Sequence, residues 1–406
     1  MNIPITYFKE LKDTNATWDA LKDSLVSNGL RLITSSEVPF VVARYAKESS
    51  NNVVNPLFRS VIFDSTTNTV VSFAPQKAFE GAPPVNTPFT QVEDFVDGCM
   101  LQVFMTTNDP NTIHLATRTQ IGAMNAFYSK KTFAQLFEEC LAMTPIRTME
   151  ALKNIMSAQL TAFGAYSVFA SFVIQHPEHR VVYKYKTPDL SMVHFGWTAI
   201  DGTVNLQEDS QSWDPQLKRL QIPRYPVESF ASDEECTALM RRTAVQNGFC
   251  WQGLVFKDGK GNRWRTRSTS YMMLRGLRGA EATSVERFLR LRKAGKVVDY
   301  LKHYSEERDD FWQLETTLRA RTNDILRAYE AFAKTHSVSF AQLPPAYKPG
   351  VHMLHALYLN TLRLEKVPVR LANVISIVNS MKTFEQRRLI EAEPLGELGT
   401  QAPVVV

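Results

Sequence analysis

The sequence predicts an α+β protein in which a domain of antiparallel sheets precedes an all-helical carboxyl-terminal domain. Up to Tyr271, short β-branched or aromatic runs alternate with Asn, Pro, Asp and Gly turns, which is typical of strands in antiparallel sheets. Beyond Tyr271, apolar residues recur at helical spacing at Phe311, Leu314, Leu318, Ile325, Tyr329 and Phe332. We therefore expect a first domain over 1–275, a helical domain over 276–392 and a flexible tail over 393–406.

Within the first domain, the apolar runs and the turn residues place the individual elements. Helices are expected over residues 17–27, 131–143 and 148–163, and strands over 60–63, 69–73, 100–106 and 181–185. The glycine-rich segment 257–262 resembles a phosphate loop in composition, but its Asp-Gly and Gly-Asn dipeptides favour a hairpin turn between two strands. In the second domain, helices are expected over 284–304, 351–364 and 368–392.

Composition excludes several classes of protein. The chain has 406 residues, of which 44% are hydrophobic, and it has neither a run of eighteen apolar residues nor an amino-terminal signal sequence. We therefore expect a soluble, intracellular chain with no membrane span. The four cysteines lack the paired short spacing of a zinc ribbon, so they are expected to be buried thiols. His176 and His179 flank Pro177 and are expected on a surface turn, and no metal role is expected for His352 and His355.

Positive charge is concentrated in one part of the chain. The net charge is only +5, yet residues 257–302 contain thirteen Lys or Arg against four Asp or Glu. Such a band, with aromatic residues beside it, favours binding to nucleic acid through phosphates and stacked unpaired bases. The alternative is a solvated helix face that contacts the acidic remainder of the protein. The candidate nucleic-acid contacts are Arg263, Arg265, Arg267, Arg287, Arg290, Arg292, Lys293 and Lys296.

Residues 92–101 read Val-Glu-Asp-Phe-Val-Asp-Gly-Cys-Met-Leu, which resembles the Lys-x-Asp-Gly-Ser-Leu signature of covalent nucleotidyltransferases. This class contains RNA ligases, DNA ligases and mRNA capping enzymes. In the class, the lysine amine attacks the α-phosphate of ATP or GTP and carries the nucleotide as a phosphoramidate. Asp97 and Gly98 match the signature, but Phe95 stands in place of the lysine. A phenyl ring has no lone pair with which to attack phosphorus.

Other segments resemble the T4 RNA ligase 1 family in the same order along the chain. Residues 55–79 are similar to its opening hairpin, where an arginine and a lysine face the nucleotide phosphates, and Arg59 and Lys77 are the matching positions. Residues 113–119 match a strand that ends in a basic residue, here Arg118. The resemblance implies a nucleotidyltransferase, ATP-grasp-like core followed by helices, and it favours single-stranded or structured RNA over DNA as the partner. It also implies a nucleotide-like pocket at Arg59, Lys77, Asp97, Gly98 and Arg118.

Four further positions depart from the family in chemically critical ways. Residues 172–185 are similar to Phe-Glu-x-x-x-Pro-x-Asn-Arg-Ile-Val, but Val173 replaces the glutamate. Gln252 replaces the glutamate of Glu-Gly-x-Val, and Arg265 and Arg267 replace the lysines of Lys-x-Lys-Ser. The first two changes remove carboxylates, the oxygen ligands that Mg²⁺ prefers. The other two keep the charge but exchange a compact ammonium for a planar guanidinium.

These departures predict a catalytically inactive RNA ligase-like protein with a nucleic-acid-binding or structural role. No catalytic residue, metal site or cofactor is expected. Because ligases of this family are common in phages and large DNA viruses, the resemblance also implies a viral origin and a place in the virion. One alternative is an active ATP-dependent RNA ligase that uses ATP, Mg²⁺ and another lysine such as Lys77. Another is a structural subunit of a virion or complex that acts only through protein partners.

Overall fold

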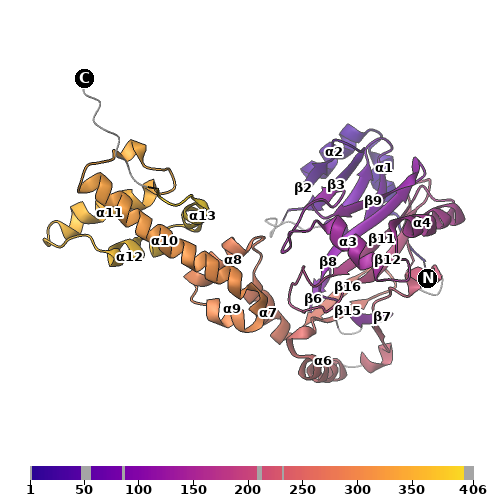
Figure 1. Ribbon diagram of the computed structural model, residues 1–406. Helices are drawn as coiled ribbons and strands as arrows, with labels where there is room; N and C mark the ends of the chain where they lie inside the picture. Colours follow the sequence, from indigo (N-terminus) through magenta and orange to yellow (C-terminus); the bar gives the residue numbers. More distant parts are fainter. Residues whose placement is uncertain (1, 47–55, 85–86, 208–212, 231–232, 397–406) are drawn as a thin grey trace. The chain divides into compact units, whose positions relative to one another are not determined.

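The computed structural model describes residues 2–46, 56–84, 87–207, 213–230 and 233–396 (Figure 1). It divides into two compact units, Met1–Gly276 and Leu277–Val406. The first contains antiparallel sheets with helices, and the described part of the second contains helices only, so the predicted α+β class is confirmed. In the described parts of the chain, no helix combines the length and the apolar character that crossing a membrane requires.

The described residues of the first unit form three sheets. The largest has the order β1 (Asn2–Ile5), β13 (Val204–Gln207), β12 (Asp189–Thr198), β11 (Ser167–Gln175), β8 (Cys99–Thr106), β9 (Asp109–Thr117) and β10 (Gln120–Ile121). The second has the order β14 (Arg224–Tyr225), β7 (Gln91–Asp94), β15 (Gly253–Lys257), β16 (Arg263–Arg267) and β6 (Phe79–Glu80). The third has the order β2 (Leu30–Thr34), β3 (Phe40–Tyr45), β4 (Val61–Asp64) and β5 (Thr69–Phe73). Paired strands are antiparallel except β16 and β6.

Strand β11 lies at the centre of the unit, and all nine of its residues are buried. Successive strand residues point to opposite faces, so β11 contributes to two apolar cores. On one face, Val168, Ala170 and Phe172 pack with the helices α3 (Phe133–Ala142) and α4 (Met149–Phe163). On the other, Phe169 packs against Phe73 of the third sheet, which α1 (Tyr7–Thr14) and α2 (Trp18–Ser27) cover. Both faces of β11 are therefore covered by apolar cores, which hold this strand in place.

The elements with strong local sequence patterns lie where they were predicted. Helix α2 and strand β5 match the expected ranges 17–27 and 69–73 to within one residue. Helix α4 begins after Thr148, whose hydroxyl accepts a hydrogen bond from the Ala151 N–H, and it ends at Gly164 with a φ of 53°. A hydroxyl cap and a left-handed glycine are common boundaries of helices. The hairpin at 257–262 is also confirmed, since β15 pairs with β16 across it.

The strand predicted over 181–185 is wrong. This segment is a loop between β11 and β12, and its backbone bonds to a side chain instead of to a neighbouring strand. The N–H groups of Val182 and Tyr183 donate to the Asp97 carboxylate at 2.9 and 2.8 Å. Val182 is therefore buried by tertiary contacts, although the run does not form a strand.

Two expectations about burial are also wrong. His176 and His179 are not on the surface, and one of the four cysteines expected to be buried is exposed. His176 and His179 are each only 3% exposed, although they flank a turn proline. His176 is buried because both of its ring nitrogens form hydrogen bonds, to Glu139 and to the backbone of Glu178. Cys250 is exposed, since it follows α6 (Asp233–Asn247) in a short 3₁₀ turn, whereas Cys140 and Cys236 are buried.

The second unit is built around the long helix α10 (Arg308–Ala333), whose predicted apolar stripe is buried at Phe311, Leu318, Ile325 and Tyr329. The helix expected over 284–304 is two helices, α8 (Ser284–Lys293) and α9 (Val297–His303), because Gly295 between them has a φ of 65°. The remaining helices are α11 (Lys348–Leu357), continued by a π-helical turn at Tyr358–Leu362, α12 (Leu371–Ser380) and α13 (Thr383–Glu391). Of the expected tail, residues 397–406 lie outside the described residues.

Asp97 and Gly98 join three segments that are distant in sequence. The Asp97 carboxylate accepts the two backbone bonds from the 181–185 loop and a third from the Tyr271 hydroxyl at 2.7 Å, at the start of α7 (Thr269–Arg278). Gly98 lies against β11, where an added Cβ would stand 2.3 Å from the Ile174 carbonyl oxygen and 2.6 Å from Val173 Cγ1. Asp97 therefore needs its carboxylate, and the next position needs glycine, for reasons of folding alone.

Replacing Gly98 by alanine is expected to lower the free energy of unfolding by about 1–3 kcal/mol, because the methyl group would overlap the backbone of β11. Chemical denaturation measures this change. Gly276→Ala is the matched control, because no atom lies within 4 Å of its added Cβ and the residue is exposed in α7. This control should be neutral or stabilising by up to about 1 kcal/mol. Equal effects of the two substitutions would contradict the close approach.

Candidate anion-binding cavity

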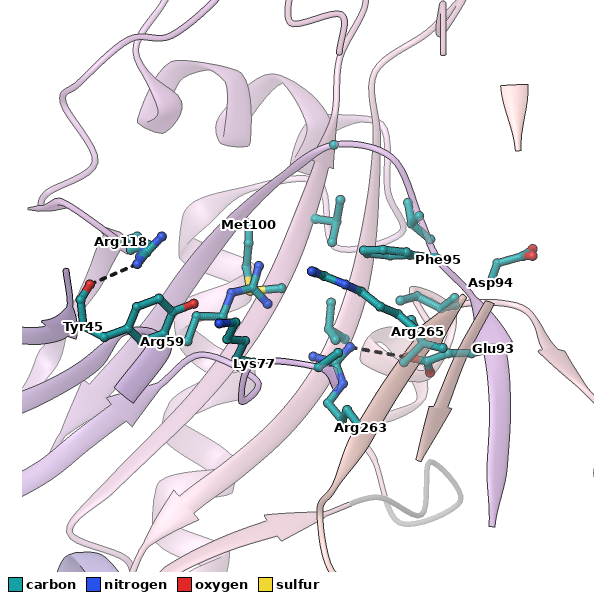
Figure 2. Close-up of a pocket in the computed structure, with 17 residues that line it drawn as sticks. Tyr45, Arg59, Lys77, Glu93, Asp94, Phe95, Met100, Arg118, Arg263 and Arg265 are labelled. Atoms are coloured by element: carbon teal, nitrogen blue, oxygen red, sulfur yellow. Dashed lines mark hydrogen bonds and ion pairs between the residues drawn. The ribbon is translucent and has the colours of Figure 1, made fainter. Parts of the chain in front are cut away.

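A cavity of about 270 Å³ lies where the three sheets of the first unit meet (Figure 2). Its walls come from segments distributed over the first unit, from the end of β3 to β16. The lining residues are Tyr45, Arg59, Lys77, Ala78, Glu93, Asp94, Phe95, Val96, Gly98, Met100, Arg118, Val173, Val193, Ile222, Val255, Arg263 and Arg265. The predicted positions Arg59, Lys77, Phe95, Gly98, Arg118, Val173 and Arg265 therefore lie around one space.

Five of the described lining residues are cations: Arg59, Lys77, Arg118, Arg263 and Arg265. Arg59 lies at the end of the 3₁₀ turn Pro56–Arg59. Burial, and secondly repulsion from Arg263, lowers the pKa of its guanidinium to about 10. Among the described residues no carboxylate pairs with Arg59. A charged group held in this way favours an anion in the cavity.

Tyr45 holds two of the other cations. The Arg118 guanidinium lies 4.5 Å from the centre of the Tyr45 ring, and its Nη2 donates to the Tyr45 carbonyl oxygen at 3.1 Å. The Lys77 ammonium lies 5.4 Å from the same ring centre. Cation–π contacts fix these side chains without neutralising their charge. Both cations therefore remain available to an anion.

The two acidic residues of the described lining are already engaged. Glu93 is 3% exposed, and its carboxylate lies 3.0 Å from the Lys257 ammonium and 4.0 Å from the Arg263 guanidinium. Asp94 accepts hydrogen bonds from the Tyr225 hydroxyl at 2.7 Å and the Trp251 indole at 3.0 Å, and it points away from Arg263 (Figure 2). The cavity consequently has an excess of positive charge and no uncommitted carboxylate among these residues.

Phe95 occupies the cavity wall directly after β7, where its N–H donates to the Gly253 carbonyl at 2.9 Å. Its ring centre lies 5.9 Å from the Arg265 guanidinium carbon and 5.8 Å from that of Arg267. Both arginines also pair with Glu80, at 2.9 and 3.1 Å. The phenyl ring is thus an aromatic partner for two arginines at the position that the resemblance assigns to a nucleophile.

Not every predicted site residue faces this space. Asp97 is buried and accepts three hydrogen bonds from the chain itself, and neither it nor Gln252 is among the lining residues. Conversely, Tyr45 and Glu93 line the cavity but were not predicted. Glu93 lies inside the recognised segment 92–101, so its position could have been noticed. Nothing in the sequence around Tyr45 indicates that its ring holds two cations.

The residues of the predicted basic band are divided between the two units. Its first part, Arg263, Arg265 and Arg267, belongs to the cavity region described above. Arg287, expected to contact nucleic acid, is 2% exposed and pairs with Glu307 at 2.8 Å inside the second unit. This expectation is therefore wrong for Arg287, because its charge is satisfied within the helical core.

The other band residues of the second unit have mixed environments. Arg290 pairs with Glu281 at 2.8 Å, Arg292 with Glu315 at 3.0 Å, and Lys296 with Asp299 at 3.4 Å. Lys293 is exposed and has no acidic partner among the described residues. Internal ion pairing thus accounts for much of the charge that the sequence concentrates in this segment.

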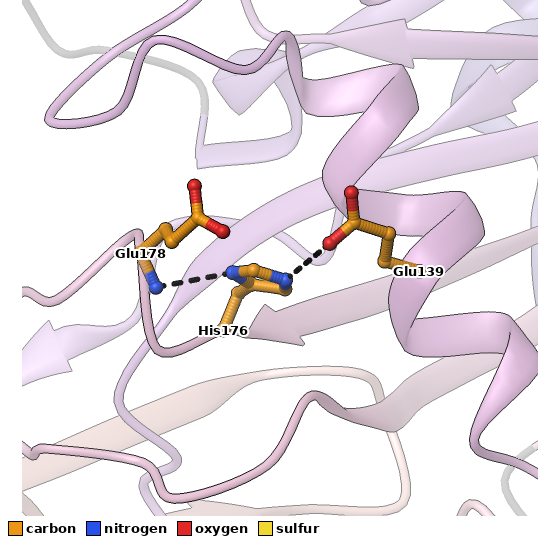
Figure 3. Close-up of side chains that lie close together, drawn as sticks. All are labelled: Glu139, His176 and Glu178. Atoms are coloured by element: carbon orange, nitrogen blue, oxygen red, sulfur yellow. Dashed lines mark hydrogen bonds and ion pairs between the residues drawn. The ribbon is translucent and has the colours of Figure 1, made fainter.

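One cluster in the first unit has the composition of a metal site. Single ligand atoms of Glu139, His176 and Glu178 lie within 4.8 Å of one another (Figure 3). The Lys131 ammonium already lies between the two carboxylates, 2.9 Å from Glu139 and 2.7 Å from Glu178. His176 Nδ1 accepts the Glu178 N–H at 3.1 Å, so the ring proton belongs on Nε2, which faces Glu139. A ligating histidine has the opposite arrangement, with the second nitrogen donating. We therefore assign the cluster to ion pairing.

Comparison with known proteins gives little beyond this geometry. No protein-family model matches the chain, and no curated protein matches its sequence. Among solved structures, the chain is similar to an archaeal ATP-dependent RNA ligase, form 1, with a TM-score of 0.38 and 12% sequence identity. The match covers 73% of this chain and 80% of that one. A likeness this distant does not define a family, so the proposals below depend on the residues of the cavity.

Replacing Arg59 by methionine is expected to raise the thermal unfolding temperature of the ligand-free protein, because it removes an unpaired charge held among other cations. The free energy of unfolding should rise by about 1 kcal/mol or more. The same variant should lose most of the stabilisation that saturating tripolyphosphate gives the unmodified protein, about 3 kcal/mol at a hundredfold excess over Kd.

Arg242→Met is the matched control for this experiment, because Arg242 is exposed on α6 and does not line the cavity. It should change neither the unfolding temperature nor the response to tripolyphosphate. If Arg59→Met destabilises the protein and leaves the response intact, Arg59 does not belong to an anion site.

Proposed function

We propose that this chain is a catalytically inactive relative of the covalent nucleotidyltransferases that binds a phosphate group of a nucleic acid or nucleotide without becoming covalently attached to it. The observation that carries the proposal is the position of Phe95. It stands on the wall of a cavity lined by five cations, where the resemblance requires the attacking lysine. The protein acts by binding, either as a nucleic-acid-binding protein or as a structural component that engages phosphate.

The choice of phosphate follows from the charge and geometry of the lining. Guanidinium groups donate two parallel hydrogen bonds to phosphate oxygens, and Arg59, Arg118 and Arg263 provide such groups. Val173 places an apolar side chain where the family has a carboxylate. With Glu93 and Asp94 engaged elsewhere, these residues offer no oxygen ligands for a Mg²⁺ ion. Binding without a divalent cation is therefore the mode that these residues support.

The alternative of an active ligase requires another nucleophile, and Lys77 is the candidate because it lines the same cavity. Its ammonium lies over the Tyr45 ring, on the side of Arg118 and Arg59 in Figure 2, whereas Phe95 is on the opposite wall. Nucleophilic attack requires near-contact with the α-phosphate in line with the leaving group. A nucleotide placed for a nucleophile at position 95 would not satisfy this condition at Lys77.

Incubation with radiolabelled ATP or GTP and Mg²⁺ or Mn²⁺ is expected to leave no label on the protein after denaturing electrophoresis. The physical reason is the absence of an amine at position 95. Lys77→Ala serves as the control variant, because it removes the amine of the alternative mechanism. A labelled band that disappears in Lys77→Ala would establish that mechanism and reject ours.

Restoring the amine alone is not expected to restore chemistry. In Phe95→Lys the new ammonium would enter a cavity lined by five cations whose two carboxylates, Glu93 and Asp94, are already engaged by other groups, so nucleotide attachment should remain undetectable. The triple variant Phe95→Lys, Val173→Glu, Gln252→Glu supplies the missing carboxylates and is the matched comparison. Labelling of the single variant would show that the lost carboxylates matter less than proposed. Labelling of the triple variant only would support the assignment of all three positions.

A further inference from the structure

A second cavity, of about 830 Å³, lies within the helical unit and is unrelated to the phosphate site. It is a groove bordered by the ends of α8 and α9 and the beginning of α10. Its floor is apolar, with Phe288, Val297, Leu301 and Phe311. At its border, the Trp312 side chain is 68% exposed and Val298 is 70% exposed. An exposed tryptophan beside an apolar groove is typical of the centre of a protein interface.

Charges of both signs flank this groove. Lys293 and Arg308 line it, and Asp309 precedes Trp312 by three residues, so the two are neighbours on one face of α10. All three charged residues are exposed, and none of their side chains forms an ion pair or hydrogen bond in the parts of the chain that the structure describes. In contrast, Arg292 and Glu315 in the same groove neutralise one another at 3.0 Å.

We propose that the occupant of this groove is the same surface of a second copy of the chain. In a two-fold symmetric interface, each copy presents the same residues, so a surface fits itself only if it contains both halves of each contact. This surface contains both halves of each contact. It has the exposed Trp312 indole and an apolar groove that can receive an indole, and it has the cations Lys293 and Arg308 near the Asp309 carboxylate. Trp312 of each copy inserts into the groove of the other, and Lys293 of each copy faces Asp309 of the other.

The distribution of charge favours this occupant over a nucleic acid. A polyanion would be attracted by Lys293 and Arg308 but repelled by Asp309 on the same face of α10. The exposed apolar residues besides Trp312 are aliphatic, as at Val298, and they offer no ring on which a base could stack. A partner with apolar groups and charges of both signs uses every exposed group of the surface.

Sedimentation equilibrium of the full chain, from about 1 to 100 μM, tests the proposal. The unmodified protein is expected to dimerise within this range, and Trp312→Ala should raise the dissociation constant at least about thirtyfold, as loss of a central tryptophan does. Val298→Ala should weaken the dimer less. Phe384→Ala is the control, because Phe384 is 55% exposed in the same unit on α13, outside the groove, and it should have no effect.

A charge exchange makes the test specific to the two-fold arrangement. Lys293→Asp and Asp309→Lys should each weaken the dimer about tenfold, because each places like charges opposite one another. The double variant should recover the dimer, since the pair is restored with its signs reversed. Circular dichroism verifies that every variant is folded.

Three results would overturn the proposal. One is a protein that stays monomeric over the whole concentration range. Another is a dimer that Trp312→Ala leaves unchanged. The third is a monomeric protein that binds a single-stranded oligouridylate in a manner lost in Trp312→Ala, which would make the groove a nucleic-acid site. None of these results depends on whether the cavity of the first unit binds phosphate.

Discussion

The three hydrogen bonds accepted by the Asp97 carboxylate are the constraint on which the rest of the first unit depends. They tie the segment after β7 to the loop that follows β11 and to the first turn of α7. The adjacent Gly98 allows this segment to approach the backbone of β11. Together they determine where β7, β8 and β11 meet, and hence where the wall of the cavity lies. A buried carboxylate that accepts three hydrogen bonds from the chain itself stabilises the fold, because burial without those donors would be costly.

This arrangement gives the residues of segment 92–101 two different roles, one in the fold and one in the cavity wall. Asp97 and Gly98 serve the fold, and they remain whether or not the site performs chemistry. Phe95 and Val173 face the cavity, where the fold tolerates an apolar side chain but phosphoryl chemistry does not. The cations of the lining lie close together although they repel one another, and the pKa of Arg59 is lowered first by burial and secondly by repulsion from Arg263. Retaining unfavourable charges in this way is characteristic of a binding site, where stability is sacrificed for function.

Sequence patterns predicted the elements that local interactions determine. Thr148 and Gly164 delimit α4, and the β-branched run 69–73 forms β5, because caps and alternating burial act over a few residues. The predictions failed where contacts with segments distant in the sequence determine the local structure. Val182 bonds to Asp97 instead of to a strand, and His176 is buried by Glu139.

Some residues of the candidate site could likewise be predicted from the sequence, and others could not. The resemblance identified Arg59, Lys77 and Phe95, which the fold brings around one cavity. It could not indicate that Tyr45 fixes Arg118, or that a basic segment contains Arg287 in the core beside Glu307. Charge counted along the sequence does not distinguish a surface cation from one neutralised inside a helical unit. Only the three-dimensional pairing separates Arg287, which Glu307 neutralises, from Arg59, for which the described residues offer no carboxylate.

The central claim is that the cavity recognises phosphate directly, without a metal ion and without reaction. Calorimetric titration of ATP into the protein, once with EDTA and once with Mg²⁺, tests it most directly. The account predicts reversible binding in EDTA that Mg²⁺ weakens, because the metal competes with the arginines for the phosphate oxygens. Binding that requires Mg²⁺, or no binding in EDTA at low ionic strength, would contradict it.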